Sequence, residues 1–393
     1  MNPIQKSSKA RSLFSFCAFH FLDDGFSDSI YLLLPFIATE LGLSFSQVGM
    51  LRGISSGCIG LFQFPLSLLG ERIGEVIVIA LGTFGLAGGF LLLGKSHTFL
   101  TILFSLMFAK ATGAGQHGLS SSVLSRTFEV SGRRAAMGTY NFSGDLGKVC
   151  IPFLLALMIN LWGWRQAIFT ISLGGMAVGA FLYILVSKQK EHPPSFHTTQ
   201  TFNSESTGWG IKNRKKFLAL LTIGMIDVAA RYSLLTFLPF LLLQKGIPVT
   251  QFGFALTLLF VGGAVGKFAC GVLAEWFGII PMVVGTEILT TAGILSLTVL
   301  PASWIWFVLP LVGIVLNGTS SVLYATVAEM IAPASRSRGY GLYYAITLGS
   351  GALSPLAFGL LTDSMGLSFT IVITALMLVI TLPLSRYLSP KST

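Results

Sequence analysis

The sequence predicts an all-α integral membrane protein with twelve transmembrane helices in two six-helix pseudo-repeats. Three observations predict it: the composition, the lengths of the apolar runs and an internal repeat. The 393-residue chain is 53% hydrophobic and 10% charged, whereas ordinary globular domains are about 25% charged. Its mean hydropathy of +0.78 places most side chains against lipid and argues against a soluble protein. The net charge of +10 then indicates basic loops, not a nucleic-acid-binding surface.

Twelve apolar runs are long enough to cross a bilayer, which takes about 20 residues of helix. Short polar breaks separate them, so consecutive helices should be antiparallel. The expected spans are residues 12–38, 46–69, 76–94, 98–125, 135–160, 165–187, 216–243, 250–274, 280–300, 303–328, 339–361 and 366–388. Basic residues precede the first span, but Asp23, Asp24 and Asp28 interrupt it, which argues against a cleaved signal peptide.

The basic residues orient these spans. If both termini are cytoplasmic, the outer loops carry only Lys95, Arg165 and Lys245, and most other Lys and Arg residues face the cytoplasm. The positive-inside rule therefore predicts this topology, and we expect a bacterial cytoplasmic (inner) membrane protein that acts as a monomer.

The longest polar stretch divides the helices six and six. We expect an N-terminal six-helix bundle over 1–187, a flexible cytoplasmic linker over 188–215, and a C-terminal six-helix bundle over 216–393. The four cysteines lie singly in apolar runs, and no phosphate-binding G-x-x-x-x-G-K-[ST] loop is present. No cofactor and no metal are therefore expected.

The two halves resemble one another at a nearly constant offset. An offset of 204 aligns Asp23 with Asp227, Pro35 with Pro239, Gly42 with Gly246, Glu71 with Glu275 and Gly74 with Gly278; an offset of 203 then aligns Gly163 with Gly366. One register held from the first to the third helix indicates a duplicated six-helix unit in parallel orientation. Such repeats place the substrate site near the bilayer midplane, between the halves.

With these features the chain resembles the major facilitator superfamily over its whole length. The loop after the second span keeps that family's acid, Arg and Gly as Glu71, Arg72 and Gly74, although Ser67 and Glu75 depart from the family pattern. Glu275 lies between two matching glycines in the second half. The resemblance implies a major facilitator fold and a secondary active transporter working by alternating access. It also implies that Glu71, Arg72, Gly74 and Glu275 form a cytoplasmic gate.

Within the superfamily, the first half is similar to the fosmidomycin-resistance-type branch and its sugar and drug efflux relatives. The similarity rests on His20 with Asp23 or Asp24, on Leu34-Pro35, and on the run Gly113-Ala114-Gly115-Gln116-His117. It favours efflux as the direction of transport.

Charged residues inside the first span are the candidates for proton coupling. His20, Asp24 and Asp28 repeat at i, i+4 and i+8 on one helix face, with Asp23 on the adjoining strip. Intramembrane charges are costly and generally functional. Crowded carboxyl groups also bind protons more readily than isolated ones. The alternative is that some of these aspartates form fixed ion pairs that only hold helices together.

Further intramembrane charges are candidates for substrate binding. The candidates are Asp227 with Arg231, Lys110 with His117, and Asp145 with Lys148. Asp227 and Arg231 stand at i, i+4, so they could form an inert ion pair or a switchable one. Asp145 and Lys148 could likewise neutralise each other.

We therefore expect a proton-coupled transporter that exports a small organic solute and whose partners are that solute, protons and the lipid bilayer. The same residues would suit import of an organic anion by proton symport, with Arg231, Lys148 and Lys110 binding the anion. Two other classes remain open: a membrane transferase with catalytic His and Asp residues, and a transport-fold sensor. The duplicated halves argue against the transferase.

Overall fold

The computed structural model describes residues 3–128, 132–187, 210–332 and 336–388. In this part of the chain all regular structure is helical, apart from one isolated bridge between Ile211 and Ile331. Residues 188–209 of the expected linker lie outside the described residues. Its last residues do not form an open connection, because the backbone of Lys212 donates to Met330 and that of Ala332 to Gly210, at 3.0 and 2.8 Å.

The chain divides into two units, Met1–Gly42 with Ile54–His197, and Leu43–Gly53 with Thr198–Thr393. The helices up to the linker are α1 (Pro3–Leu41), α2 (Phe45–Ile73), α3 (Glu75–Gly94), α4 (Phe99–Gly113), α5 (Gln116–Thr127) and α6 (Arg133–Ser187). The first unit contains these helices except the start of α2, because Leu43–Gly53 is grouped with the second unit.

After the linker the second unit consists of α7 (Arg214–Gln244), η1 (Val249–Gln251), α8 (Phe252–Phe277), α9 (Ile279–Val299), α10 (Ala302–Met330), α11 (Arg336–Met365), α12 (Leu367–Leu376), η3 (Met377–Ile380), α13 (Thr381–Ser385) and η4 (Arg386–Leu388). Helix α7 begins two residues before the predicted boundary at 216. The Asn213 side chain caps it by accepting from the Lys216 backbone at 3.1 Å.

The described helices account for all twelve expected spans. Nine of these helices are, taken singly, long and apolar enough to cross a membrane. Helix α6 contains two spans, because its backbone turns at Gly163 (φ 76°, ψ 161°). Helix α1 is not among these nine because it carries too many charged residues, the aspartates among them. The predicted continuous helix over 98–125 is instead divided at Ala114 and Gly115 into α4 and α5, each too short to be counted.

The internal repeat extends to the backbone conformation. Positive φ angles occur at Gly42 and Gly246 (60° and 79°), at Gly74 and Gly278 (104° and 88°), and at Gly163 and Gly366 (76° and 88°). These are the pairs aligned by the offsets of 204 and 203. A residue with a Cβ rarely adopts such angles, so both halves use glycine to turn the chain at equivalent ends of their helices.

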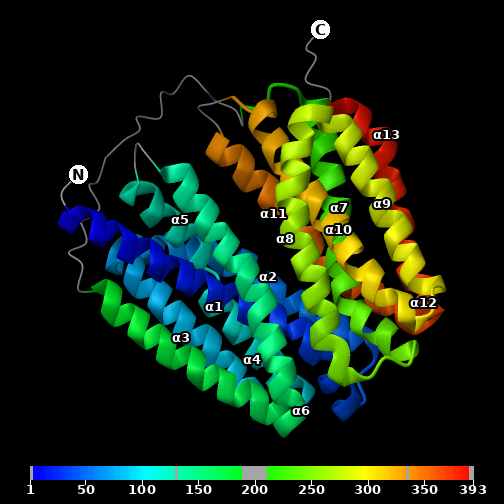
Figure 1. Cartoon of the computed structure of the whole chain (residues 1–393), viewed down its shortest axis with the longest axis horizontal. Coiled ribbons are helices and arrows are strands. Elements are labelled where there is room, and N and C mark those ends of the chain that lie inside the picture. Colours follow the sequence, from blue (N-terminus) through cyan, green and yellow to red (C-terminus); the bar gives the residue numbers. More distant parts are fainter. Residues whose placement is uncertain (1–2, 129–131, 188–209, 333–335, 389–393) are drawn as a thin grey trace. The chain divides into compact units, whose positions relative to one another are not determined.

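Small residues let the helices of each unit approach closely. In the first unit α1 packs along α6, and α3 packs along α4 and α6 (Figure 1). A Cβ on Gly147 of α6 would overlap the carbonyl of Phe21 on α1. In the second unit α8 packs along α10 and α7 along α11, and Gly262 and Gly266 of α8 face backbone carbonyls of α10 in the same way. This packing is typical of membrane helices, which associate without a hydrophobic driving force.

A polar corner joins the ends of α1 and α3 to the turn within α6 in the first unit, where one span ends and the next begins. Just after the turn at Gly163, Arg165 binds the Glu40 carboxylate with Nη2 at 2.7 Å and Nε at 3.0 Å, and Trp164 donates to the same carboxylate at 2.8 Å. Arg165 also donates to the backbone carbonyl of Ser96, beyond the end of α3. One side chain thus ties the ends of α1 and α3 to the turn within α6.

Candidate functional site

A cluster of charged side chains lies inside the first unit. Helix α1 contributes His20, Asp23, Asp24 and Asp28, α4 contributes Lys110, α5 contributes His117, and α6 contributes Asp145 and Lys148. These are all the first-half residues predicted for proton coupling or substrate binding. They come from four helices and up to 128 positions of sequence, so their assembly depends on the packing of α1 against α6 and α4.

Asp24 is the centre of this cluster. Its Oδ2 lies 3.0 Å from Lys148 Nζ and 3.3 Å from His20 Nε2, and its Oδ1 lies 3.6 Å from His117 Nε2. The Asp24 side chain is 9% exposed. A carboxylate this buried is stable in its charged form only with such partners.

The hydrogen bonds of His20 define a place for one proton. Its Nδ1 lies 2.7 Å from the Tyr140 carbonyl oxygen, which can only accept, so Nδ1 must carry hydrogen. In a neutral imidazole Nε2 then has no hydrogen, and its lone pair would face the Asp24 carboxylate. The contact is favourable when one proton lies on His20 Nε2 or on Asp24. The contact thus offers a place for one proton, on His20 Nε2 or on Asp24.

The other charged groups surround this pair. Asp23 Oδ2 lies 3.6 Å from His117 Nε2, Lys148 Nζ lies 3.4 Å from Asp145 Oδ1, and Asp28 acts electrostatically on Lys148. Lys110 Nζ donates to the Ser27 carbonyl at 3.1 Å. Lys148 thus lies between Asp24 and Asp145, so the predicted Asp145–Lys148 pair is part of a larger network.

The cluster is accessible on one side. The His117 side chain is 48% exposed and that of Lys148 is 26% exposed, whereas His20 is 5% exposed. Water or a solute can therefore reach His117 and Lys148, while the His20–Asp24 pair lies behind them. On the buried side Gly144 of α6 leaves room for the pair, since a Cβ there would lie 2.6 Å from Asp24 Oδ2 and from His20 Nε2.

His20, Asp24 and His117 also offer a donor set for a metal ion. Their ligand atoms lie within 4.8 Å of one another, and the Tyr140 carbonyl orients His20 as second-shell partners do in metal sites. The Lys148 ammonium group at 3.0 Å from Asp24 opposes a divalent cation by charge repulsion. A proton fits these side chains better than a metal does.

The second unit has its own polar group, around Arg231 of α7. The guanidinium donates to Ser320 Oγ at 3.1 Å and to Asn317 Oδ1 at 3.5 Å, both on α10. It interacts electrostatically with Asp227, one turn earlier on α7. Asp227 is 3% exposed, and its Oδ2 has no hydrogen-bond partner among the described residues. The structure therefore gives Arg231 partners on α10 in addition to the predicted Asp227.

The four residues predicted to form a gate lie at helix ends. Glu71 and Arg72 are exposed, and within the described residues no ion pair joins either of them to another side chain. Gly74 turns the chain between α2 and α3. Glu75, where the family pattern has a basic residue, forms an ion pair with Arg126 at the end of α5. This acid accounts for the departure from the pattern, because it fixes α3 to α5.

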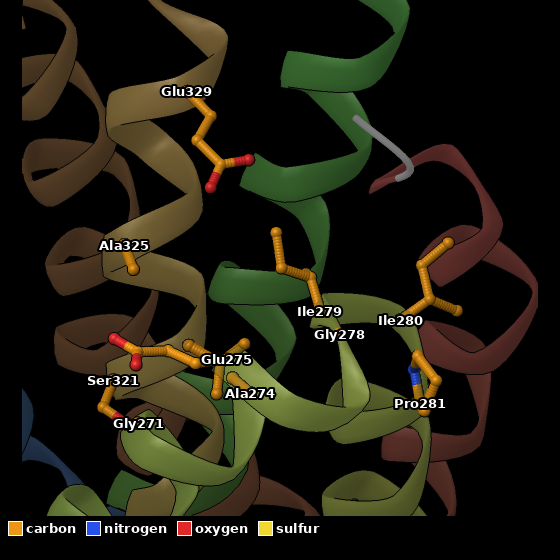
Figure 2. A pocket seen from close by; sticks show the side chains of 11 residues that line it. Gly271, Ala274, Glu275, Gly278, Ile279, Ile280, Pro281, Ser321, Ala325 and Glu329 are labelled. Atoms are coloured by element: carbon orange, nitrogen blue, oxygen red, sulfur yellow. The ribbon is translucent and has the colours of Figure 1, made fainter. Parts of the chain in front are cut away.

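Glu275 borders a pocket of about 750 Å³ formed by the end of α8, the start of α9 and part of α10. Figure 2 shows its side chain extending from α8 toward α10, where Ser321 lies, and Glu329 further along the same helix. The remaining lining is mainly apolar. No basic side chain is among the lining residues. The pocket is adjacent in sequence to the polar group around Arg231, because Ser321 follows Ser320 on α10.

Sequence reasoning missed several polar residues. Asn317 and Ser320 were not predicted because uncharged residues give little signal in a membrane helix. Gln116, next to His117, is 4% exposed and its amide has no partner among the described residues. Glu287 is the only acid in the apolar run 280–300, and that isolation was the signal that could have identified it.

The chain matches the model of the Major Facilitator Superfamily over residues 15–226 and again over 220–393. The protein therefore belongs to this superfamily; it is a multi-pass membrane transporter of small molecules and not an enzyme.

Among curated relatives, the chain is 25% identical over 254 residues to the probable L-galactonate transporter of Escherichia coli K12, covering 61% of this chain and 56% of that protein. The match thus spans little more than half of that relative. The fosmidomycin resistance protein of the same organism is 23% identical over 397 residues, covering 94% of this chain and 91% of that protein.

Among solved structures, a bacterial homologue of the human lysosomal transporter Spinster superimposes with a TM-score of 0.80 at 17% identity. The match covers 100% of this chain and 99% of the other. At this identity the likeness shows the fold alone, and it agrees with the predicted twelve-helix architecture.

Proposed function

We propose that this protein is a proton-coupled secondary active transporter that exports a small organic solute by alternating access. The observation that carries the proposal is the His20–Asp24 contact. Nδ1 of His20 is committed to the Tyr140 carbonyl, so the 3.3 Å contact with Asp24 is stable with one proton. Coupling requires a group that binds a proton in one conformation of the transporter and exchanges it with water in another.

Proton binding would change the partners of Lys148. When the proton lies on Asp24, the attraction between Asp24 and Lys148 weakens, and Asp145 at 3.4 Å is the remaining carboxylate in contact. Loss of the proton restores the Asp24–Lys148 ion pair at 3.0 Å. The proton thereby alters a contact between α1 and α6, which is a local change from which a larger rearrangement can start.

In this proposal the solute binds at His117, Lys148 and Asp145, with the buried Lys110 behind them, and Arg231 and Asp227 of the second unit also bind it. Glu71, Arg72, Gly74 and Glu275 serve as the cytoplasmic gate. The distribution of basic residues supports cytoplasmic termini in a bacterial inner membrane. The monomer is the proposed functional form.

Import of an organic anion by proton symport is a second candidate. Lys148 and His117 lie on the accessible side of the cluster, Lys110 and His20 are buried behind them, and Arg231 offers a planar guanidinium in the second unit. L-Galactonate, after which one relative is named, is a carboxylate. The fosmidomycin resistance protein matches far more of the chain, which supports efflux as the first candidate.

The test is transport in proteoliposomes. A panel of organic acids, sugars and drugs is first screened for compounds that raise the thermal stability of the purified protein. Flux of a stabilising compound is then measured with and without an imposed pH gradient. We expect the solute flux to depend on the pH gradient. In antiport the solute moves in the direction opposite to the protons, and in symport it moves in the same direction as the protons.

The matched variants are Asp24→Asn and Asp28→Asn, with Glu329→Gln as the control. Asp24→Asn should reduce gradient-driven flux by more than about tenfold, and Asp28→Asn should weaken it. Glu329 is an exposed acid at the end of α10, so its variant should transport like the wild type. Flux in Asp24→Asn that follows the gradient as in the wild type would refute the assignment. A stabilising ligand that is never transported would favour the sensor.

A further inference from the structure

Glu287 is a buried acid with no hydrogen-bonding partner in the described part of the chain. It lies in the middle of α9 and is 1% exposed, and neither carboxylate oxygen has a partner among the described residues. Thr290, three residues on and 2% exposed, also has an unpartnered hydroxyl oxygen. The neighbouring Thr286 hydroxyl donates to the Met282 carbonyl, as is common in membrane helices.

The elements around α9 offer Glu287 almost no charge. Helices α12, η3 and α13 pack on it and contain no Asp, Glu, Lys, Arg or His. The charged residues of the other elements packed on it are Lys267 and Glu275 on α8, Glu329 on α10 and Arg386 on η4.

The group that acts electrostatically on Glu287 is Asp227 of α7. Asp227 is itself 3% exposed with one unpartnered carboxylate oxygen. Arg231 interacts electrostatically with Asp227, and so do Tyr324 and Tyr343. Three of the four oxygens on these two carboxyl groups therefore lack a hydrogen-bond donor among the described residues.

An ionised carboxylate in this position is unstable. Removing a charge from water without hydrogen bonds is strongly unfavourable, and a second carboxylate nearby adds repulsion. A bound proton removes the charge of Glu287 and also supplies an O–H donor. The cost is avoided most simply if Glu287 binds a proton.

We propose that Glu287 is a second proton-binding site of this protein, located in the second unit and coupled to Asp227. The ligand is a single proton, held on the Glu287 carboxyl group, and Arg231 affects it through Asp227. The site is separate from the His20–Asp24 pair, and it does not depend on the solute or on the direction of transport.

The internal repeat shows that this acid is particular to the second half. The offset of 204 that aligns Asp227 with Asp23 aligns Glu287 with Thr83 of α3. Thr83 is also buried, at 4% exposed, but its hydroxyl donates to the Ile79 carbonyl at 3.0 Å. The first half thus has a satisfied hydroxyl where the second half has an unsatisfied carboxyl group. Fold maintenance alone needs no acid here.

Difference infrared spectroscopy of the purified full-length protein tests the proposal. A protonated carboxyl group has a carbonyl stretch distinct from that of a carboxylate, and the proton itself is the ligand that is titrated. At pH 7 the wild type should show this band, and Glu287→Gln, which is nearly isosteric, should lose one carboxyl equivalent of it. Glu329→Gln and Asp24→Asn should both keep the Glu287 band, because they lie outside this site.

Coupling is tested with Asp227→Asn. This variant should keep the Glu287 band and lower the pH at which it disappears, since removing a neighbouring negative charge weakens proton binding. A protonated-carboxyl band that is unchanged in Glu287→Gln would overturn the proposal, because Glu287 would then be ionised in the folded protein. If Glu287→Gln does not fold, an unchanged titration in Asp227→Asn would overturn the coupling. None of these results depends on transport, so failure here is distinguishable from failure of the proposed function.

Discussion

Asp24 is both a packing contact of the first unit and the residue to which we assign proton coupling. It contacts Lys148, His20 and His117 at 3.0–3.6 Å, so it links α1 to α5 and α6. The same contacts make its charge sensitive to one proton on His20. An ion pair that served only to hold helices together would not need the histidine oriented by the Tyr140 carbonyl.

Gly144 provides a test of this geometry that leaves every charge in place. In Gly144→Ala the new methyl group would lie 2.6 Å from Asp24 Oδ2 and from His20 Nε2, well inside van der Waals contact. We expect the pair to be displaced and gradient-driven flux in proteoliposomes to fall by more than about tenfold.

Gly138→Ala is the matched control for that variant. Gly138 lies on the same helix, and a Cβ there would meet nothing within 4 Å. Its replacement should leave flux unchanged and stabilise the helix by about 0.5–1 kcal/mol. Equal flux in the two alanine variants would contradict a role for the close packing at His20 and Asp24.

At the scale of single residues, sequence reasoning identified the charges but not their partners. It found every charged member of the first-unit cluster, because charge is rare in membrane helices and therefore conspicuous. It could not place Lys148 against Asp24, since these residues are 124 positions apart and meet only through the packing of α1 on α6. It missed Glu287, although this acid is isolated in the apolar run 280–300, because the candidates were chosen as groups of charges at helical spacing.

At the scale of helices, the corner at Glu40 fixes the end of α1. The hydrogen bonds from Arg165 and Trp164 favour the ionised carboxylate and hold the pKa of Glu40 below its usual range. Glu40 lies just beyond the span expected for the first helix, and its side chain is 40% exposed. Its contribution to stability is therefore limited by solvent screening to less than about 1 kcal/mol.

The pH dependence of this corner has a definite sign. A lowered carboxyl pKa in the folded state means that Glu40 stabilises the protein above its unfolded-state pKa, and that the stabilisation is lost as the pH falls through the folded-state pKa. Glu40→Gln should lower the thermal midpoint in detergent at pH 7 by a small amount. The difference from the wild type should vanish below about pH 4.

Glu71→Gln is the control, because Glu71 is exposed and has no ion pair with any other described residue. Its thermal midpoint should follow the wild type across the same pH range. A Glu40→Gln midpoint that differs from the wild type equally at pH 4 and pH 7 would contradict an electrostatic role for the corner.

Helix boundaries were partly predictable. Gly74, Gly163, Gly278 and Gly366 end or turn helices where the sequence predicts breaks, because their positive φ angles suit glycine. The division of the fourth span into α4 and α5 was not predicted. The run Gly113-Ala114-Gly115 contains no proline or charge, and its backbone stays close to helical at Ala114 and Gly115. This break separates Lys110 from His117, yet both side chains contact α1.

At the scale of the whole molecule, composition and repeat were sufficient to predict the fold. Scarcity of charge indicated the membrane, run lengths indicated twelve spans, and the constant offset indicated two six-helix halves, all in agreement with the family match over both halves. The substrate cannot be predicted in this way, because many solutes are compatible with one fold. The repeat also shows where the halves have diverged: the first half carries the His20–Asp24 cluster and the second carries Glu287.

In the proposed mechanism solute movement and proton movement are coupled, and proton movement driven by the solute alone is the sharpest test of that coupling. Proteoliposomes containing a pH-sensitive dye are prepared without a pH gradient, and a gradient of the transported solute is then imposed. We expect a pH change in wild-type vesicles that is absent in Asp24→Asn and present in Glu329→Gln. Solute flux without any pH change in the wild type would contradict it.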